Sequence, residues 1–271
     1  MFHDCFSYYI AQNVSVVVGL QLFSFNLLAT TRFGSPNDTI LLGAHLDSVA
    51  EGPGINDNGS GSAALLELAI ALAQYRTNSR VRFAWWTEEE QGLLGSYSYT
   101  KSTPQWELDN TRLYLNLDML ASPNYKLERH MREDSPGSRH AADTFARFFK
   151  AQRQNYTTRL GGSRSDHQVF EWAGIPTSGL STGSRALKSA QLVDEFGGEV
   201  NKQFDRNYHT INDTVANVNQ TALEIMAMAI SNVVGTYARS IDGFPERNFT
   251  DQVRMDEDDI MSMSEAERLL C

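Results

Sequence analysis

The chain has 271 residues, of which 41% are hydrophobic and 21% charged, and its formal net charge is -10. A chain of this length can bury one large core, and its acidic balance argues against nucleic acid as a partner, because phosphate binding needs a basic face. No run of about 18 apolar residues occurs in it, so we expect neither a membrane-spanning helix nor a membrane partner.

Extended and helical patterns alternate along the chain. Residues 14–29 are rich in β-branched and aromatic residues and predict two strands. Further apolar runs predict strands, and apolar residues at helical spacing predict helices, in the order strand 39–45, helix 61–75, strand 80–86, strand 112–120, helix 138–152, strand 174–180 and helix 220–238. This alternation predicts an α/β fold, a three-layer sandwich with a mostly parallel central sheet flanked by helices.

Histidine and carboxylate side chains follow several of the predicted strands. His45, Glu89 and Asp118 lie at or just beyond strand ends, where open α/β sheets form their sites. Asp57 lies in the Gly-rich stretch INDNGSG and His209 in NYHTINDT. Taken singly, each is usually a structural or solvated residue. Together, imidazoles and carboxylates without paired thiolates suit catalytic zinc, and their number suits two metals about 3.5–4 Å apart that share a carboxylate.

Six motifs occur in an order that resembles one family, the secreted bacterial and fungal leucine aminopeptidases with two co-catalytic zinc ions (aminopeptidase Y-like peptide hydrolases), in particular its fungal branch. They are GAHLDS, GPGINDNGSGSAALLE, RFAWWTEEEQGLLGS, RLYLNLDMLASPNY, GGSRSDHQVFEWAGIPTSGL and FDRNYHTINDT. The resemblance runs from Asn26 to Tyr237. It implies a catalytic domain over residues 26–241, after a divergent or truncated N-terminal segment 1–25 and before an acidic C-terminal tail 242–271.

The resemblance also implies the metal ligands. Two Zn²⁺ ions per chain would share Asp57, which the family often follows with a cis peptide bond. The first ion would be bound by His45, Asp57 and Asp118, and the second by Asp57, Glu90 and His209.

The three consecutive glutamates Glu88 to Glu90 can be aligned with a catalytic Glu-Glu pair in two ways. The family motif Glu-Glu-x-Gly-Leu-x-Gly-Ser fits only residues 89–96, so the resemblance makes Glu89 the general base, Glu90 a ligand, and Glu88 a neighbour without a role.

Further residues take roles from the same resemblance. Asp47 resembles the carboxylate that orients His45, and Tyr208 the phenol that donates to the tetrahedral oxyanion. Met119 and Arg164 are predicted to bind substrate. The family often has an aromatic residue at the position of Ser181, so we expect a different pocket here.

The implied activity is that of a zinc-dependent aminopeptidase, which removes an apolar N-terminal residue from peptides with a free N-terminus by means of water activated by two metals. The alternatives are a carboxypeptidase-like or glutaminyl-cyclase-like relative and a relative that binds without hydrolysis. We expect a monomer.

The family is secreted, and the chain has many Asn-x-Ser/Thr sequons, although no clear signal peptide begins it. We therefore predict an extracellular glycoprotein. The sequons lie at Asn13, Asn37, Asn58, Asn155, Asn212, Asn219 and Asn248. Cys5 and Cys271 have no CxxC partner, and we expect them to be unpaired.

Overall fold

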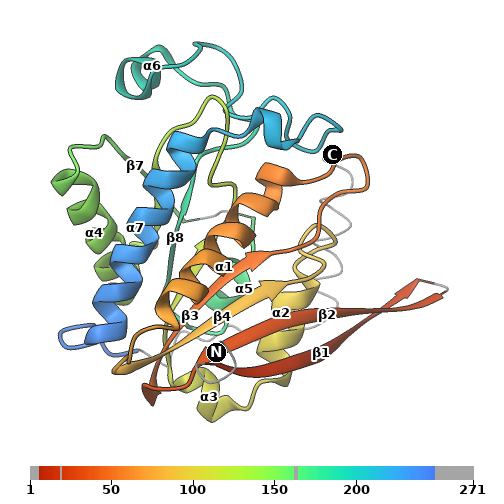
Figure 1. The fold of residues 1–271 in the computed structure, drawn as a ribbon, viewed down its shortest axis with the longest axis vertical. Coiled ribbons are helices and arrows are strands. Elements are labelled where there is room, and N and C mark those ends of the chain that lie inside the picture. The colour runs from red at the N-terminus through yellow and green to blue at the C-terminus, as the bar shows by residue number, and fades with distance from the viewer. Residues whose placement is uncertain (1–5, 19, 162–163, 248–271) are drawn as a thin grey trace.

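The computed structural model describes residues 6–18, 20–161 and 164–247 (Figure 1). Cys5, Cys271, the sequon at Asn248 and most of the predicted acidic tail lie outside the described residues. Among the described helices, none combines the length and apolar character that crossing a bilayer requires.

An eight-stranded sheet forms the centre of the described fold, in the order β1-β2-β4-β3-β5-β8-β6-β7. The four central strands β4, β3, β5 and β8 are parallel, whereas β1 and β2 form an antiparallel hairpin and β6 runs antiparallel to β8. The strands are β1 (Phe6–Val18), β2 (Leu20–Thr31), β3 (Ser35–His45), β4 (Ser79–Trp86), β5 (Thr111–Leu117), β6 (Glu128–Met131), β7 (Thr157–Leu160) and β8 (Thr177–Ser181). All the predicted strands are present.

Helices cover both faces of the sheet, so the predicted three-layer α/β sandwich is confirmed (Figure 1). On one face α7 packs against both α1 and α4, and α2 and α5 cover the other face. The helices are α1 (Gly61–Leu72), α2 (Leu94–Ser102), α3 (Gln105–Asp109), α4 (Pro136–Ala151), α5 (His167–Trp172), α6 (Ala190–Phe196) and α7 (Gln220–Arg239), with the short segments η1 (Ile55–Ser60) and η2 (Val215–Asn217).

The alternation of side chains along β3 explains its continuous apolar run. Ile40 and Leu42 pack into the larger core beneath α1, α4 and α7. Leu41 points to the other face, into a smaller core where the rings of Tyr114 and Phe170 stack with centroids 3.9 Å apart. A strand buried on both faces needs apolar residues at every position.

Two four-residue strands, β6 and β7, extend the sheet beyond β8 and were not predicted. Their residues are mostly polar. Glu128 is buried in β6, and its carboxylate accepts hydrogen bonds from Lys126 and from Arg159 of β7. Because these charges neutralise one another locally, polar residues can occupy a covered part of the sheet here.

The division into residues 1–25, 26–241 and 242–271 stays a prediction. β2 runs across the first of these boundaries. Beyond the second, Arg247 is anchored to the folded body, because its guanidinium donates hydrogen bonds to the carbonyls of Ala173 and Gly174 at 2.9 and 3.1 Å.

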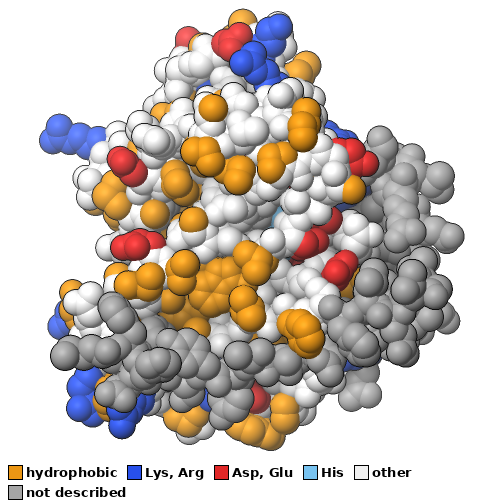
Figure 2. Space-filling view, turned by 45° about the vertical axis from the view of Figure 1, so that its right-hand side comes forward, with side chains coloured by type: hydrophobic (Ala, Val, Ile, Leu, Met, Phe, Trp, Pro, Cys, Tyr) orange, Lys and Arg blue, Asp and Glu red, His pale blue; other side chains and the backbone are white. Residues whose placement is uncertain are grey.

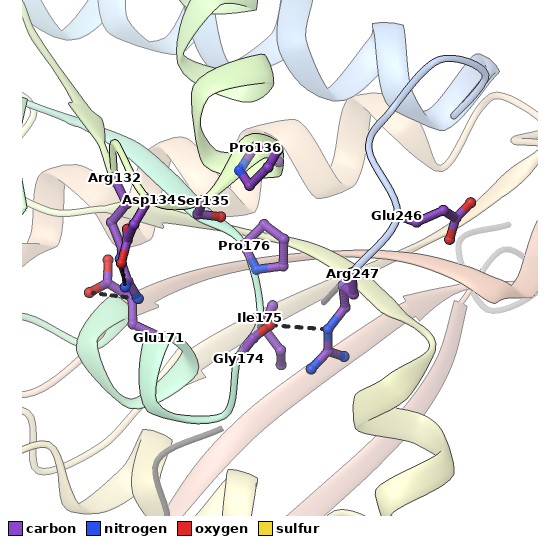
Figure 3. A pocket seen from close by; sticks show the side chains of 11 residues that line it. Arg132, Asp134, Ser135, Pro136, Glu171, Gly174, Ile175, Pro176, Glu246 and Arg247 are labelled. Atoms are coloured by element: carbon purple, nitrogen blue, oxygen red, sulfur yellow. Dashed lines mark hydrogen bonds and ion pairs between the residues drawn. The ribbon is translucent and has the colours of Figure 1, made fainter. Parts of the chain in front are cut away.

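Arg247 lies in a hollow that we call the Arg247 pocket (Figure 3). Pro176, just before β8, and Arg132, just after the antiparallel strand β6, both line it. The pocket therefore lies at the edge of the sheet where the central strands begin. Its lining residues are Arg132, Asp134, Ser135, Pro136, Gly137, Glu171, Gly174, Ile175, Pro176, Glu246 and Arg247.

The surface in Figure 2 carries a patch of hydrophobic side chains, and acidic side chains lie beside a hollow next to it. Exposed apolar residues of the described chain include Phe25 and Leu27 on β2 and Leu66 and Ile70 on α1.

Candidate metal centre

The five predicted metal ligands converge at the carboxyl ends of the central strands. His45 ends β3, Asp118 follows β5 directly, and Glu90 lies in the turn after β4. Because these strands are parallel neighbours, their ends meet at one edge of the sheet. Asp57 in η1 and His209 in the loop before η2 reach the same place.

The carboxylate of Asp57 lies between the two imidazole rings. Its Oδ1 is 3.1 Å from Nε2 of His45, and its Oδ2 is 3.1 Å from Nε2 of His209. Asp118 Oδ1 lies 3.6 Å from Nε2 of His45, and Glu90 Oε2 lies 3.1 Å from Nε2 of His209. Each imidazole thus faces the shared carboxylate and one further carboxylate.

Some of these polar atoms have no hydrogen-bond partner within the described chain. Within the described chain, Oε1 of Glu90 and Oδ1 of Asp118 are both buried and have no hydrogen-bond partner, although buried polar atoms normally form hydrogen bonds. Imidazole nitrogens and carboxylate oxygens together are suitable ligands for a divalent metal ion. Two groups of residues each bring possible ligand atoms within 4.8 Å of one another. One group is His45, Asp57 and Glu90, and the other is His45, Glu89 and Asp118.

The electrostatics of this cluster favour charged groups despite their burial. Burial raises the pKa of Asp57, but hydrogen bonds with His209 and His45 outweigh it and lower the pKa to about 2. Burial lowers the pKa of His209, but hydrogen bonds with Asp57 and Glu90 raise it to about 9. Protons therefore occupy the positions at which a metal would bind, so metal binding must displace them.

Asp47 contacts both sides of the site. Its backbone carbonyl lies 3.1 Å from Nδ1 of His45, closer than its carboxylate oxygen Oδ1 at 3.6 Å. A hydrogen bond from Nδ1–H to this carbonyl keeps Nε2 facing Asp57, where a metal could bind once the Nε2 proton is displaced. The Asp47 carboxylate accepts hydrogen bonds from the backbone N–H groups of Glu89 and Glu90, at 3.1 and 3.2 Å. Asp47 therefore also holds the turn that carries these two glutamates.

Glu89, Tyr208, Met119 and Arg164 line one pocket, which we call the site pocket. Its lining residues are Asp57, Glu89, Asp118, Met119, His130, Arg159, Arg164, Ser181, Ser184 and Tyr208. Burial raises the pKa of Glu89 well above its usual value, and it also raises the pKa of the Tyr208 phenol. The Tyr208 ring stacks on that of His209, with centroids 3.8 Å apart.

Sequence reasoning missed the residues that hold the loop of Asp57. Asp213 accepts hydrogen bonds from the backbone N–H groups of Asn56 at 2.8 Å and of Asp57 at 3.1 Å. The Asn56 side chain donates to Asp205 at 2.6 Å. These contacts join the loop of Asp57 to the loop of His209. The sequence offered one indication of their role, because Asn56 lies in the motif that contains Asp57 and Asp213 lies in the motif that contains His209.

A buried chain of hydrogen bonds behind Asp118 was also missed. It links Trp86 Nε1 to Tyr114 OH (3.0 Å), Tyr114 OH to Asn116 Oδ1 (2.9 Å), Asn116 Nδ2 to Ser165 Oγ (2.8 Å) and Ser165 Oγ to Asp118 Oδ2 (2.6 Å). Ser165 thus holds one oxygen of Asp118 and leaves the other facing His45.

Several backbone conformations at the site are unusual. Glu88, Leu93, Met119 and His209 have φ between 54° and 61°, a left-handed conformation that L residues adopt rarely and that clusters at functional sites. The peptide bond between Asp57 and Asn58 is cis, as the resemblance implied. The carbonyl of Met119 accepts hydrogen bonds from the backbone and the hydroxyl of Thr182, which holds its conformation.

Comparison with known proteins identifies relatives of the chain. Leucine aminopeptidase 2 of Trichophyton rubrum is 42% identical over 231 residues, 83% of this chain and 47% of that protein. Probable leucine aminopeptidase 2 of Aspergillus fumigatus is 40% identical over 238 residues, 85% of this chain and 48% of that protein. The chain thus spans about half the length of the curated relatives it matches.

Solved structures share the fold. An aminopeptidase from Aneurinibacillus sp. strain AM-1 superposes with a TM-score of 0.68 at 28% identity and covers 87% of this chain and 52% of its own. BSAP, a zinc aminopeptidase from Bacillus subtilis, gives a TM-score of 0.69 at 24% identity, over 85% and 54% of the two chains. Residues 26–234 match the family described as Peptidase family M28. The predicted resemblance is confirmed, and the chain belongs to peptidase family M28.

Proposed function

We propose that this chain is a zinc-dependent aminopeptidase that hydrolyses the N-terminal residue from peptides. The observation that carries the proposal is the position of Asp57, whose two carboxylate oxygens each lie 3.1 Å from a different imidazole. This is the arrangement expected of a carboxylate shared by two metal ions. The names of the fungal relatives and of the Bacillus subtilis structure support the same activity.

The residues present fit two zinc ions. His45 and Asp118 would complete one site and Glu90 and His209 the other, with Asp57 common to both. When bound, the two ions would polarise the scissile carbonyl and lower the pKa of a water molecule. This fit is favoured by one buried oxygen each of Asp118 and Glu90, for which the described part of the chain offers no hydrogen-bond donor.

The remaining residues would move and direct protons. Glu89, whose pKa is raised by burial, would accept a proton from the attacking water and deliver it to the leaving amine. Tyr208, whose pKa is also raised by burial, keeps its proton and would donate a hydrogen bond to the oxyanion. Asp47 would keep Glu89 and Glu90 in place through their backbone N–H groups.

The substrates we propose are peptides with a free N-terminus and an apolar first residue, with Met119 in contact with its side chain. The test uses the full chain, loaded with zinc, and two substrates, leucyl-p-nitroanilide and its N-acetylated counterpart. We expect hydrolysis of the first alone, and its loss on chelation. Cleavage of the blocked substrate would contradict an aminopeptidase. Release of C-terminal residues from N-blocked peptides would identify a carboxypeptidase-like enzyme, and cyclisation of N-terminal glutamine would identify a cyclase.

Metal analysis of the same sample tests the number of ions. We expect two zinc ions per chain at saturation. A single ion in a folded, active sample would contradict the shared role of Asp57.

We also propose that the protein is secreted, glycosylated and monomeric. Asn37 and Asn212 are exposed and open to glycan attachment, whereas Asn58 is buried beside the site and should stay unmodified. Mass spectrometry of the protein produced by a secreting fungal host measures occupancy at each sequon. Retention of unmodified protein inside the cell would contradict secretion.

A further inference from the structure

The loop after β8 brings an exposed arginine, Arg185, against the metal centre. Its Cζ lies 4.9 Å from the centroid of the Tyr208 ring, and its Nη2 lies 3.5 Å from Nδ1 of His209. Tyr208 is itself stacked on His209, and Ser184, the residue before Arg185, lines the site pocket. Arg185 is therefore both adjacent to the proposed metal ligands and accessible from solvent.

The backbone on either side of Arg185 is fixed to the segment that leads to the Tyr-His pair. The carbonyl of Ser184 accepts a hydrogen bond from the N–H of Asp205 at 2.9 Å, and the carbonyl of Ala186 accepts one from the N–H of Phe204 at 3.1 Å. Because Asp205 also holds the loop of the shared carboxylate, the same network positions the arginine and the metal ligands. A side chain that binds substrate needs such a supported backbone.

The contacts of Arg185 leave its N–H groups available to a ligand. The Tyr208 ring attracts the positive charge but offers no lone pair to the guanidinium. Nδ1 of His209 is at the long limit of a hydrogen bond, and a neutral imidazole that binds a metal through Nε2 carries its hydrogen on Nδ1, so it cannot accept there. Among the residues that the structure describes, no carboxylate pairs with Arg185.

A short peptide would bring a carboxylate to this place. With the scissile carbonyl beside the Tyr208 phenol, as proposed above, the next residue of the peptide lies within about 3.5 Å of chain length. In a dipeptide that residue ends in a carboxylate, which a guanidinium can bind through two parallel hydrogen bonds. The carboxylates of Asp57, Glu89 and Asp118 line the same pocket and would repel it, so a nearby cation is needed.

We infer that Arg185 binds the C-terminal carboxylate of short peptides, so that dipeptides with a free C-terminus are preferred substrates. Arg185 is then a specificity-determining residue for the part of the substrate that follows the cleaved bond. In longer peptides the carboxylate lies further along the chain and loses this contact. The inference rests on the proposed function.

The test compares leucylglycine with leucylglycinamide on the full, zinc-loaded chain. The two dipeptides match in size, and the amide lacks only the C-terminal charge, so the ratio of kcat/KM for the acid to that for the amide isolates this contact. We expect the acid to be favoured about three- to tenfold, because the pair is bidentate but exposed to solvent, and less so as salt is added.

Peptide length gives a second measure of the same contact. Leucyl-triglycine and its amide carry the C-terminal group two residues further on, about 7 Å more of extended chain. Their acid-to-amide ratio should therefore be close to one.

Variants locate the effect. Arg185→Met should lower the dipeptide acid-to-amide ratio toward one, and Arg185→Lys should keep part of it, because lysine retains the charge without the planar fork. Leucyl-p-nitroanilide has no carboxylate, so its kcat/KM reports any effect of these variants through the Tyr208 ring. Arg206→Met removes an exposed cation two residues before Tyr208 and should leave the ratio unchanged.

The outcomes separate the inference from the function on which it rests. Hydrolysis of leucyl-p-nitroanilide with an acid-to-amide ratio that Arg185→Met leaves unchanged would overturn the inference alone, even if that variant slowed all substrates equally. An equal fall of the ratio in Arg206→Met would also overturn it, because the general field rather than a contact would then be responsible. Failure of the folded, zinc-loaded chain to cleave the anilide or either dipeptide would overturn the proposed function, and the inference with it.

Discussion

The site pocket and the Arg247 pocket lie at opposite edges of one sheet and are built from similar residues, since arginines and carboxylates line both. Their hydrogen bonding differs. Around the Arg247 pocket, each charged residue has a partner: Arg132 binds Asp134, Glu171 accepts from Thr177, Glu246 pairs with Arg112, and Arg247 donates to backbone carbonyls. Around the site pocket, buried polar atoms of Glu90, Asp118 and His130 have no hydrogen-bond partner among the residues that the structure describes.

The comparison separates stability from chemistry. Charges that are paired inside the chain hold elements together, and removing one partner destabilises the fold because the other is left buried without a hydrogen bond. Charges that remain unsatisfied in the folded chain lower its stability and are available to a metal or substrate. Substitutions at the two pockets should therefore affect different properties, and the following predictions are ordered from the largest expected effect to the smallest.

Glu89→Gln should give the largest effect, on activity alone. Losing a general base typically costs about 10²–10⁴-fold in rate, so kcat should fall by that factor with zinc content unchanged. Because burial already disfavours the ionised form of Glu89 and raises its pKa, a neutral amide should cost no stability, and the metal-free variant should unfold at a denaturant concentration no lower than that of the parent chain.

Two neighbours serve as controls for Glu89. Glu88→Gln should change little, and Glu90→Gln should weaken zinc binding because it removes a ligand oxygen. If Glu88→Gln were inactive and Glu89→Gln lost zinc, the register of the three glutamates would be wrong by one residue.

Arg247→Met should give the opposite result, a loss of stability with no change in the kcat of the folded protein. Arg247 is 8% exposed, and its guanidinium donates to the part-buried carbonyls of Ala173 and Gly174 and to the buried carbonyl of Leu108, which would lose this donor. We expect the free energy of unfolding to fall by about 2–3 kcal/mol. Glu246→Gln, at an exposed neighbour, should change it by less than about 1 kcal/mol. A reduced kcat in a folded Arg247→Met sample would contradict the view that the Arg247 pocket serves stability alone.

Asp213→Asn should weaken zinc binding by about 10–100-fold. Asp213 accepts from two backbone N–H groups of the Asp57 loop, and an amide offers only one acceptor oxygen for both. Competition with a chelator measures the affinity, and Asn212→Ala, at the exposed neighbouring position, is the matched control. Equal affinities in the two variants would show that the loop keeps its position without this contact.

Ser165→Ala should have the smallest effect, about a tenfold loss of zinc affinity. It removes the hydroxyl that holds Asp118 Oδ2 at 2.6 Å but leaves every ligand in place. The same chelator competition applies, with the exposed Ser102→Ala as the control. A loss as large as that of Asp213→Asn would mean that Ser165 positions more than Asp118.

Apolar runs made most of the fold predictable. β3 and β5 are buried on both faces, and α1 and α7 carry apolar residues at helical spacing, so each pattern had one plausible structure. β6 was not predictable in this way, because Glu128 is buried there through partners on other segments.

The site was predictable to the extent that its residues lie in motifs. His45 and His209 stand out by residue type and by their neighbours. Asp213, Asn56 and Ser165 act through hydrogen bonds to residues 47 to 157 positions away, and no local pattern encodes such a pairing.

The chain of hydrogen bonds behind Asp118 has a direction that its members cannot reverse. It begins at the indole of Trp86, which can only donate. The Tyr114 hydroxyl must therefore accept there and give its own hydrogen to Asn116, which fixes the amide with its oxygen toward Tyr114 and its NH₂ toward Ser165. Ser165, having accepted from the amide, is left with its hydrogen pointing at Asp118. An aromatic ring buried in the smaller core thus sets the polarity of the last contact, so that Ser165 donates to Asp118 rather than accepting from it.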